Sequence, residues 1–320
     1  MNVIGIDVSQ KTLDVCLLNG TGGRNHIKTD NGADGFGALL DWVRSHRIRK
    51  AVICMEATGI YYEKAADYLS RYYPVYVVNP LKIKDYARSQ FSHTKTDKAD
   101  AVLIADYAKR HLDKLDQYQA PDDDSKRLHK LLALHHQLKC QLKQTKNRHH
   151  ASGDDVYVSA VYERIIVLLE EEIAETAVQI DALIKQHEEL KQHYGHLQTI
   201  PSVGKETAAL LLRHLSAKEF KTANNFVSFA GLSPKIEESG TSVKKKGKNR
   251  YGHKRLKQAL FMPALVAYRL NAFPVLIRNL QQSGKPKMVI IGAIMRKLAK
   301  LAYYIHKTGK PYDKNRHQPV

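Results

Sequence analysis

Two aspartates three residues apart, Asp97 and Asp100, are the residues whose types and spacing most directly suggest chemistry. They stand where a helical pattern begins, and Thr96 before them can cap that helix through its hydroxyl. Residues three apart share one face of a helix, so both carboxylates can point into one pocket. Two such carboxylates repel each other unless a cation separates them, and Mg²⁺ takes oxygen ligands of this kind. A capped surface helix with solvated acids is the alternative interpretation.

Two further acids stand where apolar strands are expected to end. Asp7 follows the strand expected at 3–6, and Glu56 ends the strand expected at 51–55. The ends of central strands are neighbours in an open sheet, so these acids are expected to meet Asp97 and Asp100. Four converging carboxylates raise one another's pKa values unless metal neutralises them. We therefore expect two Mg²⁺ ions, roughly 3.5–4 Å apart, that support phosphodiester displacement.

Asp14 also lies on an expected strand, and it is left out of this site. Side chains alternate between the two faces of a strand, and we expect this alternation to turn Asp14 away from Asp7.

The elements that would position these acids alternate between strand and helix over residues 1–120. The expected strands cover 3–6, 13–18, 26–29, 51–55 and 75–78, and the expected helices cover 36–43, 61–72, 81–91 and 97–111. Three hairpin-like strands followed by alternating units predict an α/β domain with a mixed sheet, as in the ribonuclease H-like fold.

Residues 121–196 predict a long antiparallel helical hairpin. One helical stripe carries Leu128, Leu131, Leu138 and Leu142. A second helix begins after 152–155, and its apolar positions are Ile165, Leu169, Ile173, Ile180, Leu183 and Leu190. Heptad steps from Ile173 onward predict a coiled coil that can also dimerise. A plain two-helix spacer is the alternative.

Residues 197–320 predict a helical domain that binds nucleic acid. The stretch 199–204 resembles a helix-hairpin-helix turn, which presents backbone N–H groups to a phosphate, although a simple connector fits equally well. After an apolar segment at 226–232, a basic loop runs from Ser239 to Arg250, followed by helices expected at 256–270 and 287–306. The expected nucleic-acid contacts are Gly204, Lys205, Lys244, Lys245, Lys246, Lys248, Arg250, Lys254 and Arg255.

The composition narrows the class of partner. The 320 residues carry a formal charge of +19, which indicates a polyanionic partner, most often nucleic acid. We expect no membrane-spanning segment and no signal peptide. The three scattered cysteines form no disulfide or metal pattern and suit a reducing cytosol. The doublets His135-His136 and His149-His150 lack metal-binding partners, so we expect them to be solvated or to face nucleic acid.

Seven short motifs occur in an order that resembles one family: GIDVS at 5–9, MEATG at 55–59, VNP at 78–80, KTDKADA at 95–101, IPSVG at 200–204, FAGLSP at 229–234 and SG at 239–240. The chain looks like a DEDD-type insertion-sequence transposase of the "IS one-ten" family, which includes the Piv-type DNA invertases. The resemblance covers almost the whole chain. It implies a RuvC-like catalytic domain over 1–120, an antiparallel coiled-coil hairpin over 121–196 and a helical serine transposase domain over 197–320. It also implies that Asp7, Glu56, Asp97 and Asp100 form the metal site.

The resemblance further implies a nucleophile, Ser239, which would attack DNA and form a phosphoserine link that conserves bond energy. Thr241 and Ser242 are neighbouring hydroxyls that compete for this role. Because Ser239 lies far from the acids in sequence, we expect domains, or different subunits, to come together.

The implied activity is excision and site-specific insertion of the protein's own insertion sequence. The implied partners are the element and target DNA, a structured guide RNA from the element, and further copies of the chain in a dimer or tetramer. The implied location is the cytoplasm of a prokaryote, at the nucleoid. The alternatives are a RuvC-like structure-selective endonuclease that activates water, and a non-catalytic nucleic-acid-binding scaffold.

Overall fold

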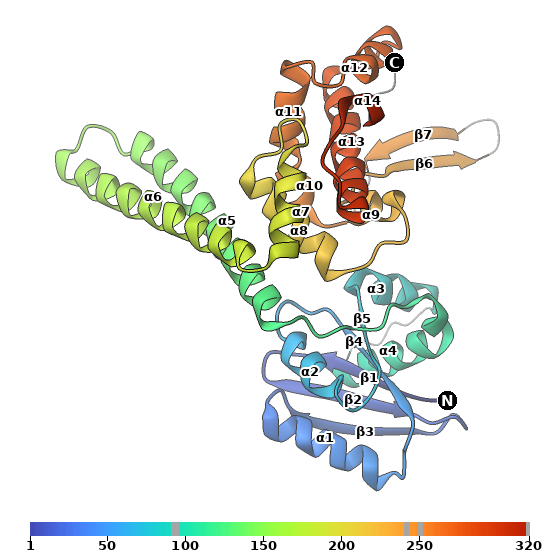
Figure 1. Ribbon diagram of the computed structural model, residues 1–320. Helices are drawn as coiled ribbons and strands as arrows, with labels where there is room; N and C mark the ends of the chain where they lie inside the picture. The colour runs from blue at the N-terminus through green and yellow to red at the C-terminus, as the bar shows by residue number, and fades with distance from the viewer. Residues whose placement is uncertain (91–95, 240–242, 249–251, 318–320) are drawn as a thin grey trace. The chain divides into compact units, whose positions relative to one another are not determined.

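The computed structural model describes residues 1–90, 96–239, 243–248 and 252–317 (Figure 1). The chain forms two compact units, Met1–Ala120 and Pro121–Val320. The division of the second unit into a hairpin and a separate helical domain stays a prediction. Lys95, Gly240, Thr241, Ser242 and Arg250, which belong to the quoted motifs or the predicted basic loop, lie outside the described residues.

The described part of the first unit holds a mixed sheet with the strand order β3-β2-β1-β4-β5. The strands are β1 (Asn2–Val8), β2 (Thr12–Leu18), β3 (Arg24–Asp30), β4 (Ala51–Glu56) and β5 (Val75–Val78). β1, β2 and β3 pair antiparallel, whereas β4 runs parallel to β1 and β5 parallel to β4. The predicted mixed sheet of an α/β domain is therefore confirmed.

Helices cover both faces of this sheet. They are α1 (Ala33–Ser45), α2 (Tyr62–Leu69), α3 (Pro80–Ser89) and α4 (Asp97–His111), and a short 3₁₀ helix, η1 (Leu112–Lys114), follows. Ile4 and Ile6 of β1 pack into the apolar core shared with α1 and α2. Val3 packs on the opposite face, in the core shared with α3 and α4. Asp7 continues the series that begins at Val3, so it lies on the α3–α4 face.

A very close approach between β1 and α4 sets the position of that helix. An ideal Cβ placed on Gly5 would lie 2.2 Å from the carbonyl oxygen of Ala101 and 2.5 Å from the backbone nitrogen of Ala105. Only glycine leaves room for a helix backbone at this distance. Gly5 therefore lets α4 lie directly on β1, two residues from Asp7.

The second unit begins with two long helices, α5 (Asp123–Ala151) and α6 (Val156–Lys185), which pack along each other as the predicted hairpin (Figure 1). The expectation that the second helix continues to Leu190 is wrong. The chain turns at His187, whose ring Nε2 lies 2.7 Å from the Asp124 carboxylate, and Leu190 belongs to the next helix. The apolar spacing continues across this turn because Leu190 packs on the same core, so periodicity alone does not reveal the break.

The prediction that His135 on the hairpin is solvated or faces nucleic acid is also wrong. His135 is only 6% exposed, and its ring Nδ1 lies 2.9 Å from the hydroxyl of Thr176 on α6. His149 is half-buried, with its Nε2 2.7 Å from the hydroxyl of Ser159. A histidine can enter a helix interface when the facing helix supplies a hydroxyl, and the sequence of one helix does not show this partner.

The remaining helices of the second unit are α7 (Glu188–Gln198), α8 (Lys205–Ala217), α9 (Ala223–Phe229), α10 (Lys254–Ala259), α11 (Phe261–Arg269), α12 (Pro274–Gln282), α13 (Lys287–Thr308) and α14 (Lys314–His317). The core of this unit centres on α13, which buries Ile291, Ile294 and Leu298 among others. The single helix expected at 256–270 is instead two helices that meet at Leu260, and α12 was not predicted.

The predicted basic loop contains a β-hairpin, and this corrects the all-helical expectation. β6 (Pro234–Ser239) and β7 (Val243–Lys248) pair antiparallel, with Ser239 opposite Val243. At the stem, Gly252 has φ +108°, and a Cβ there would lie 2.4 Å from the Cα of Gly231. The two chain segments therefore cross at van der Waals contact, and the backbone N–H of His253 donates to the carbonyl of Phe229 at 2.7 Å. This crossing holds the ends of the hairpin together.

In the described part of the chain no single helix is long and apolar enough to cross a bilayer, although the bent pair Lys254–Arg269 and Pro274–Gln282 reaches that length and composition jointly.

Candidate active site

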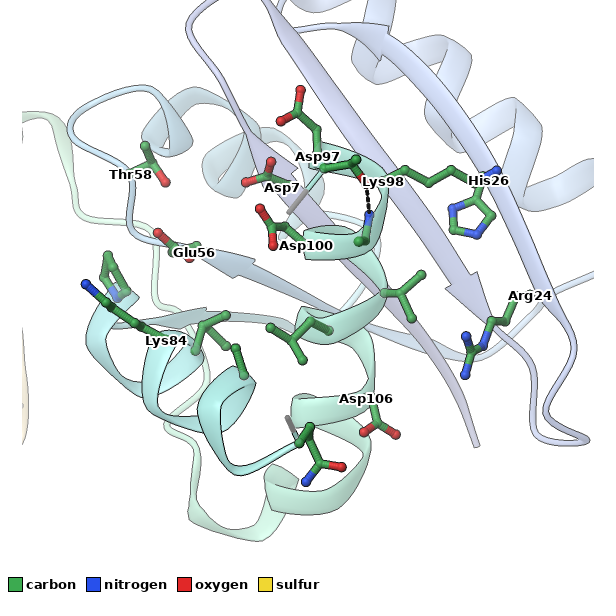
Figure 2. A pocket seen from close by; sticks show the side chains of 18 residues that line it. Asp7, Arg24, His26, Glu56, Thr58, Lys84, Asp97, Lys98, Asp100 and Asp106 are labelled. Atoms are coloured by element: carbon green, nitrogen blue, oxygen red, sulfur yellow. Dashed lines mark hydrogen bonds between the residues drawn. The ribbon is translucent and has the colours of Figure 1, made fainter. Parts of the chain in front are cut away.

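The four predicted acids line one pocket of the first unit, with a volume of about 1020 Å³. In Figure 2, Asp7 on β1 and Asp100 on α4 point toward each other. Asp97 stands beside them at the start of the helix, and Glu56 reaches toward the same space from the end of β4. Residues about 90 positions apart in the sequence are thus brought together by the close contact between α4 and β1.

The first turn of α4 orients the two helical aspartates. The backbone N–H of Ala99 donates to the Thr96 hydroxyl at 3.2 Å, which is the dashed line in Figure 2. The N–H of Asp100 donates to the Thr96 carbonyl at 2.9 Å. The predicted cap is confirmed, and it fixes where the helix begins and hence where Asp97 and Asp100 emerge.

Asp7 is the electrostatic centre of the pocket. Burial raises its pKa to about 6, assisted by the negative charges of Asp100, Asp97, Glu56 and Asp14, in that order of size. A carboxyl with this pKa is partly protonated near neutral pH unless a cation joins it. The pocket therefore favours positive charge beside Asp7.

The exclusion of Asp14 is wrong. Asp7 and Asp14 are direct partners in the antiparallel pairing of β1 with β2. Side chains alternate along one strand, but residues that face each other on neighbouring strands share a face of the sheet. Asp14 therefore adds a fifth carboxylate beside the four predicted ones, and only the strand register shows this.

Lys28 on β3 links two of these acids. Its Nζ lies 2.9 Å from Asp14 and 3.9 Å from Asp97. The hydrogen bond to Asp14 raises the pKa of Lys28, so the ammonium is held charged. Sequence reasoning missed this residue because Lys28 reaches the acids through the pairing of β2 with β3, where it stands opposite Asp14.

The donor chemistry of the pocket fits a hard divalent cation, because its acids offer only carboxylate oxygens. Within the residues that the structure describes, no three histidine, cysteine or acidic side chains lie close enough together to hold a metal as they stand. Burial first, and then the charges of the neighbouring carboxylates, raise the pKa of Asp7, and a cation beside it would offset both effects.

Basic side chains also line this pocket. Arg24 and His26 lie on β3, Lys98 on α4 and Lys84 on α3 (Figure 2). None of them was predicted as a site residue. The alternation Arg24–His26–Lys28 along β3 was visible in the sequence, but the face on which it lies was not.

The predicted residues of the C-terminal part all belong to the second unit. Ser239 is the last residue of β6, and Lys244, Lys245, Lys246 and Lys248 lie on β7. Gly204, Lys205 and Lys254 are exposed at the starts of α8 and α10.

Arg255 differs from the other predicted nucleic-acid contacts. It is half-buried, and its guanidinium donates to the Leu132 carbonyl on α5. Burial lowers the pKa of Arg255. This side chain joins α10 to α5, whereas Gly204, Lys205 and Lys254 are exposed.

Two family models match this chain. Residues 4–158 match a model of DEDD transposases of the IS110 type, described as "Transposase". Residues 194–277 match a model described as "Transposase IS116/IS110/IS902 family". Since that description covers the C-terminal part, our label "serine transposase domain" for it is wrong.

Whole-length relatives match as well. The chain is 35% identical to the "Pilin gene-inverting protein" of Moraxella bovis, over 98% of each chain, and equally so to that of Moraxella lacunata. It is 37% identical over 97 residues to the "Insertion element IS110 uncharacterized 43.6 kDa protein" of Streptomyces coelicolor, covering 30% of this chain and 22% of that one. Among solved structures, Thermus thermophilus RuvC in complex with a Holliday junction substrate matches at 13% identity, over 37% of this chain and 100% of that chain, with a TM-score of 0.28.

Proposed function

The chain belongs to the IS110 family of transposases and pilin gene-inverting proteins and is a DNA transposase or recombinase, and from this premise we propose that it excises and inserts its own insertion sequence at specific sites. The resemblance drawn from the sequence motifs is thereby confirmed. The alternative of a non-catalytic scaffold is set aside.

The observation that carries the proposal is the arrangement around Asp7. Three other predicted acids line its pocket, and burial, together with their charges, raises the pKa of Asp7 to about 6. We assign Asp7, Glu56, Asp97 and Asp100 as the ligands of Mg²⁺, in two ions. When bound, Mg²⁺ supplies positive charge to the phosphodiester and makes an attacking hydroxyl more acidic. The carboxylates would hold this positive charge at the ends of β1 and β4, and the charge would in turn set the position of the phosphodiester.

Ser239 is our proposed nucleophile. Its hydroxyl oxygen forms a bond to phosphorus while the bond from phosphorus to one sugar oxygen breaks. The serine proton leaves to a base, and the released sugar oxygen takes up a proton. The number of ester bonds to phosphorus is unchanged. A second sugar hydroxyl can therefore displace the serine oxygen and join the phosphate to a new strand. The proposal requires Ser239 and the acids to act on the same phosphodiester.

Nucleic acid is the partner that the composition supports. The surplus of 19 positive charges suits DNA and also a guide RNA from the element, which would pair with donor and target sequences. The exposed residues Gly204, Lys205 and Lys254 and the lysines of β7 are proposed contacts. We further propose that the protein acts as a homo-oligomer, a dimer or tetramer, at the nucleoid in a prokaryotic cytoplasm.

Single substitutions of the acids test this function. Asp7→Asn, Glu56→Gln, Asp97→Asn and Asp100→Asn should each reduce recombination of a plasmid-borne element at least 100-fold. Asp41→Asn is the matched control, because Asp41 is exposed on α1 in the same unit and pairs with Arg44 at 3.1 Å. Full recombination by Asp97→Asn or Glu56→Gln protein would contradict the metal-site assignment.

A water-using endonuclease is the second candidate. The observation that favours it is that all four acids lie within the first unit, so that unit contains the metal ligands by itself. In that case water would replace Ser239, and Ser239→Ala would leave strand cleavage unchanged.

A further inference from the structure

We propose that the edge strand β3 and the facing side of α4 form a binding track for the sugar–phosphate backbone of the DNA strand whose phosphodiester lies at the acids, with Arg24, His26 and Lys98 as its contacts. The track rests on the proposed function of the acidic pocket. It lies outside the C-terminal residues that we assign to nucleic-acid binding.

The register of the sheet places the basic residues of β3 in one row. Arg24, His26 and Lys28 are two residues apart, so they share a face of the strand and follow each other at about 7 Å. This is the α3–α4 face, because Lys28 stands opposite Asp14, which itself stands opposite Asp7. The row therefore starts at the acids and leads away from them along β3.

Helix α4 supplies the other side of the track. Lys98, Val102 and Asp106 are spaced four residues apart, so they lie on one face of the helix, and all three line the pocket with Arg24 and His26. Figure 2 shows Lys98 extending from the first turn of α4 toward His26. Burial lowers the pKa of His26, and the charges of Lys98 and Arg24 lower it further, so the three groups are electrostatic neighbours.

The cations of the track are available to a ligand. Arg24 and Lys98 are both exposed. Neither forms an ion pair with a carboxylate among the residues for which the structure gives positions. The nearby Asp106 accepts hydrogen bonds from Tyr86 at 2.5 Å and from Arg110 at 3.0 Å, and the charge of Arg24 contributes less than these bonds to its lowered pKa. Lys28, in contrast, is engaged by Asp14 and Asp97 and links the track to the acids.

This arrangement suits one kind of ligand. The pocket has an acidic end, which a phosphodiester can approach only when a metal ion neutralises the carboxylates. At its other end, Arg24 and His26 can meet a phosphate without a metal ion. The spacing along β3 is comparable with the spacing of successive phosphates in an extended strand. A DNA strand that enters at the acids can thus continue over His26 to Arg24, and these contacts would fix its position without reading its sequence.

The experiment compares the salt dependence of DNA binding by full-length proteins in EDTA, where no cleavage occurs. The probe is a fluorescent single-stranded oligodeoxynucleotide of 20 nucleotides and mixed sequence. Each lost phosphate contact reduces the slope of log K against log salt by about 0.7, so R24Q/K98M should reduce it by about 1.4. The matched control R49Q/K50M removes two exposed cations at the amino end of β4, opposite the acids, and should leave the slope unchanged.

Three results would overturn the track. They are an unchanged slope in R24Q/K98M, an equal loss in R49Q/K50M, and a loss seen only with an RNA oligonucleotide of the same sequence, which would assign the surface to RNA. R24K/K98R should restore the wild-type slope, which separates lost charge from misfolding. Because binding is measured without metal, a failure of the proposed chemistry leaves this result unaffected.

Discussion

Asp7 shows how much of the site depends on a single residue's surroundings. Its pKa of about 6 results first from burial and then from four carboxylates contributed by β1's neighbours and by α4. Three of those acids could be predicted from sequence, because Glu56 ends an apolar strand and Asp97 and Asp100 begin a helix. Asp14 could not, because its place beside Asp7 depends on which residues of β1 and β2 pair. The alternation of side chains along one strand does not reveal this register.

The raised pKa of Asp7 predicts a pH-dependent stability of the metal-free protein. An acid whose pKa is raised by folding stabilises the fold below its ordinary pKa of 3.8, and this contribution is lost as the pH rises through about 6. In EDTA, the melting temperature of the wild type should therefore fall between pH 4 and pH 6.5 relative to that of Asp7→Asn. Thermal unfolding followed by circular dichroism measures both profiles.

Mg²⁺ extends this test. At pH 7.5 it should raise the melting temperature of the wild type, because it offsets the repulsion among the carboxylates, and at pH 4 it should have much less effect. Asp41→Asn serves as the control for removal of an acid elsewhere in the unit. Parallel pH profiles for the wild type and Asp7→Asn would show that Asp7 is not perturbed as the structure indicates.

At the scale of elements, the position of α4 decides whether the acids meet. The helix lies on β1 through the contact of Gly5 with Ala101 and Ala105. The start of α4 was predicted from its cap, yet its distance from the sheet was not, because that distance depends on which small residues face each other. The same limit explains the missed hairpin β6–β7, since its strands lack an apolar alternation and are held at the crossing of Gly231 and Gly252.

Gly5→Ala should move α4 away from Asp7. The new methyl group would clash with two backbone atoms of the helix, which costs about 1–3 kcal/mol of unfolding free energy. Recombination should fall with it, because Asp97 and Asp100 move with the helix. Gly37→Ala on α1 is the matched control, where a Cβ meets nothing within 4 Å, and it should be neutral or stabilising by up to about 1 kcal/mol. Urea unfolding gives both values, and a Gly5→Ala protein as stable and active as the wild type would contradict the close approach.

Gly252→Ala should disturb the stem of the β6–β7 hairpin. Its φ of +108° and the 2.4 Å approach to Gly231 leave no space for a methyl group, so we expect a loss of about 1–3 kcal/mol and of serine-dependent activity. Gly292→Ala on α13, where a Cβ meets nothing within 4 Å, is the control. Limited proteolysis should cut the Gly252→Ala protein between residues 234 and 248 faster than either the wild type or the control. Equal rates of cutting in all three would show that the crossing does not hold the hairpin.

For the whole molecule, the sequence indicated the family, the mixed sheet and the four acids, because these follow from motifs, strand ends and a helix cap. It did not indicate what arises only when separate elements meet. Examples are the burial of His135 against Thr176, the turn at His187 beside Asp124, and the row of basic residues on β3. Each of these depends on contacts with a different helix or strand, which the sequence pattern of one element does not show.

The central claim is that Ser239 and the acids of the first unit act on one phosphodiester. The most direct test incubates full-length protein with Mg²⁺, end-labelled DNA carrying the element's junction and RNA transcribed from the element's flank, then denatures the products and searches for DNA attached to protein. We predict an adduct that maps to Ser239, is absent in Ser239→Ala and Asp97→Asn, and persists in Asp41→Asn. Cleaved DNA without an adduct, formed equally by Ser239→Ala, would contradict the serine mechanism and establish a water-using nuclease.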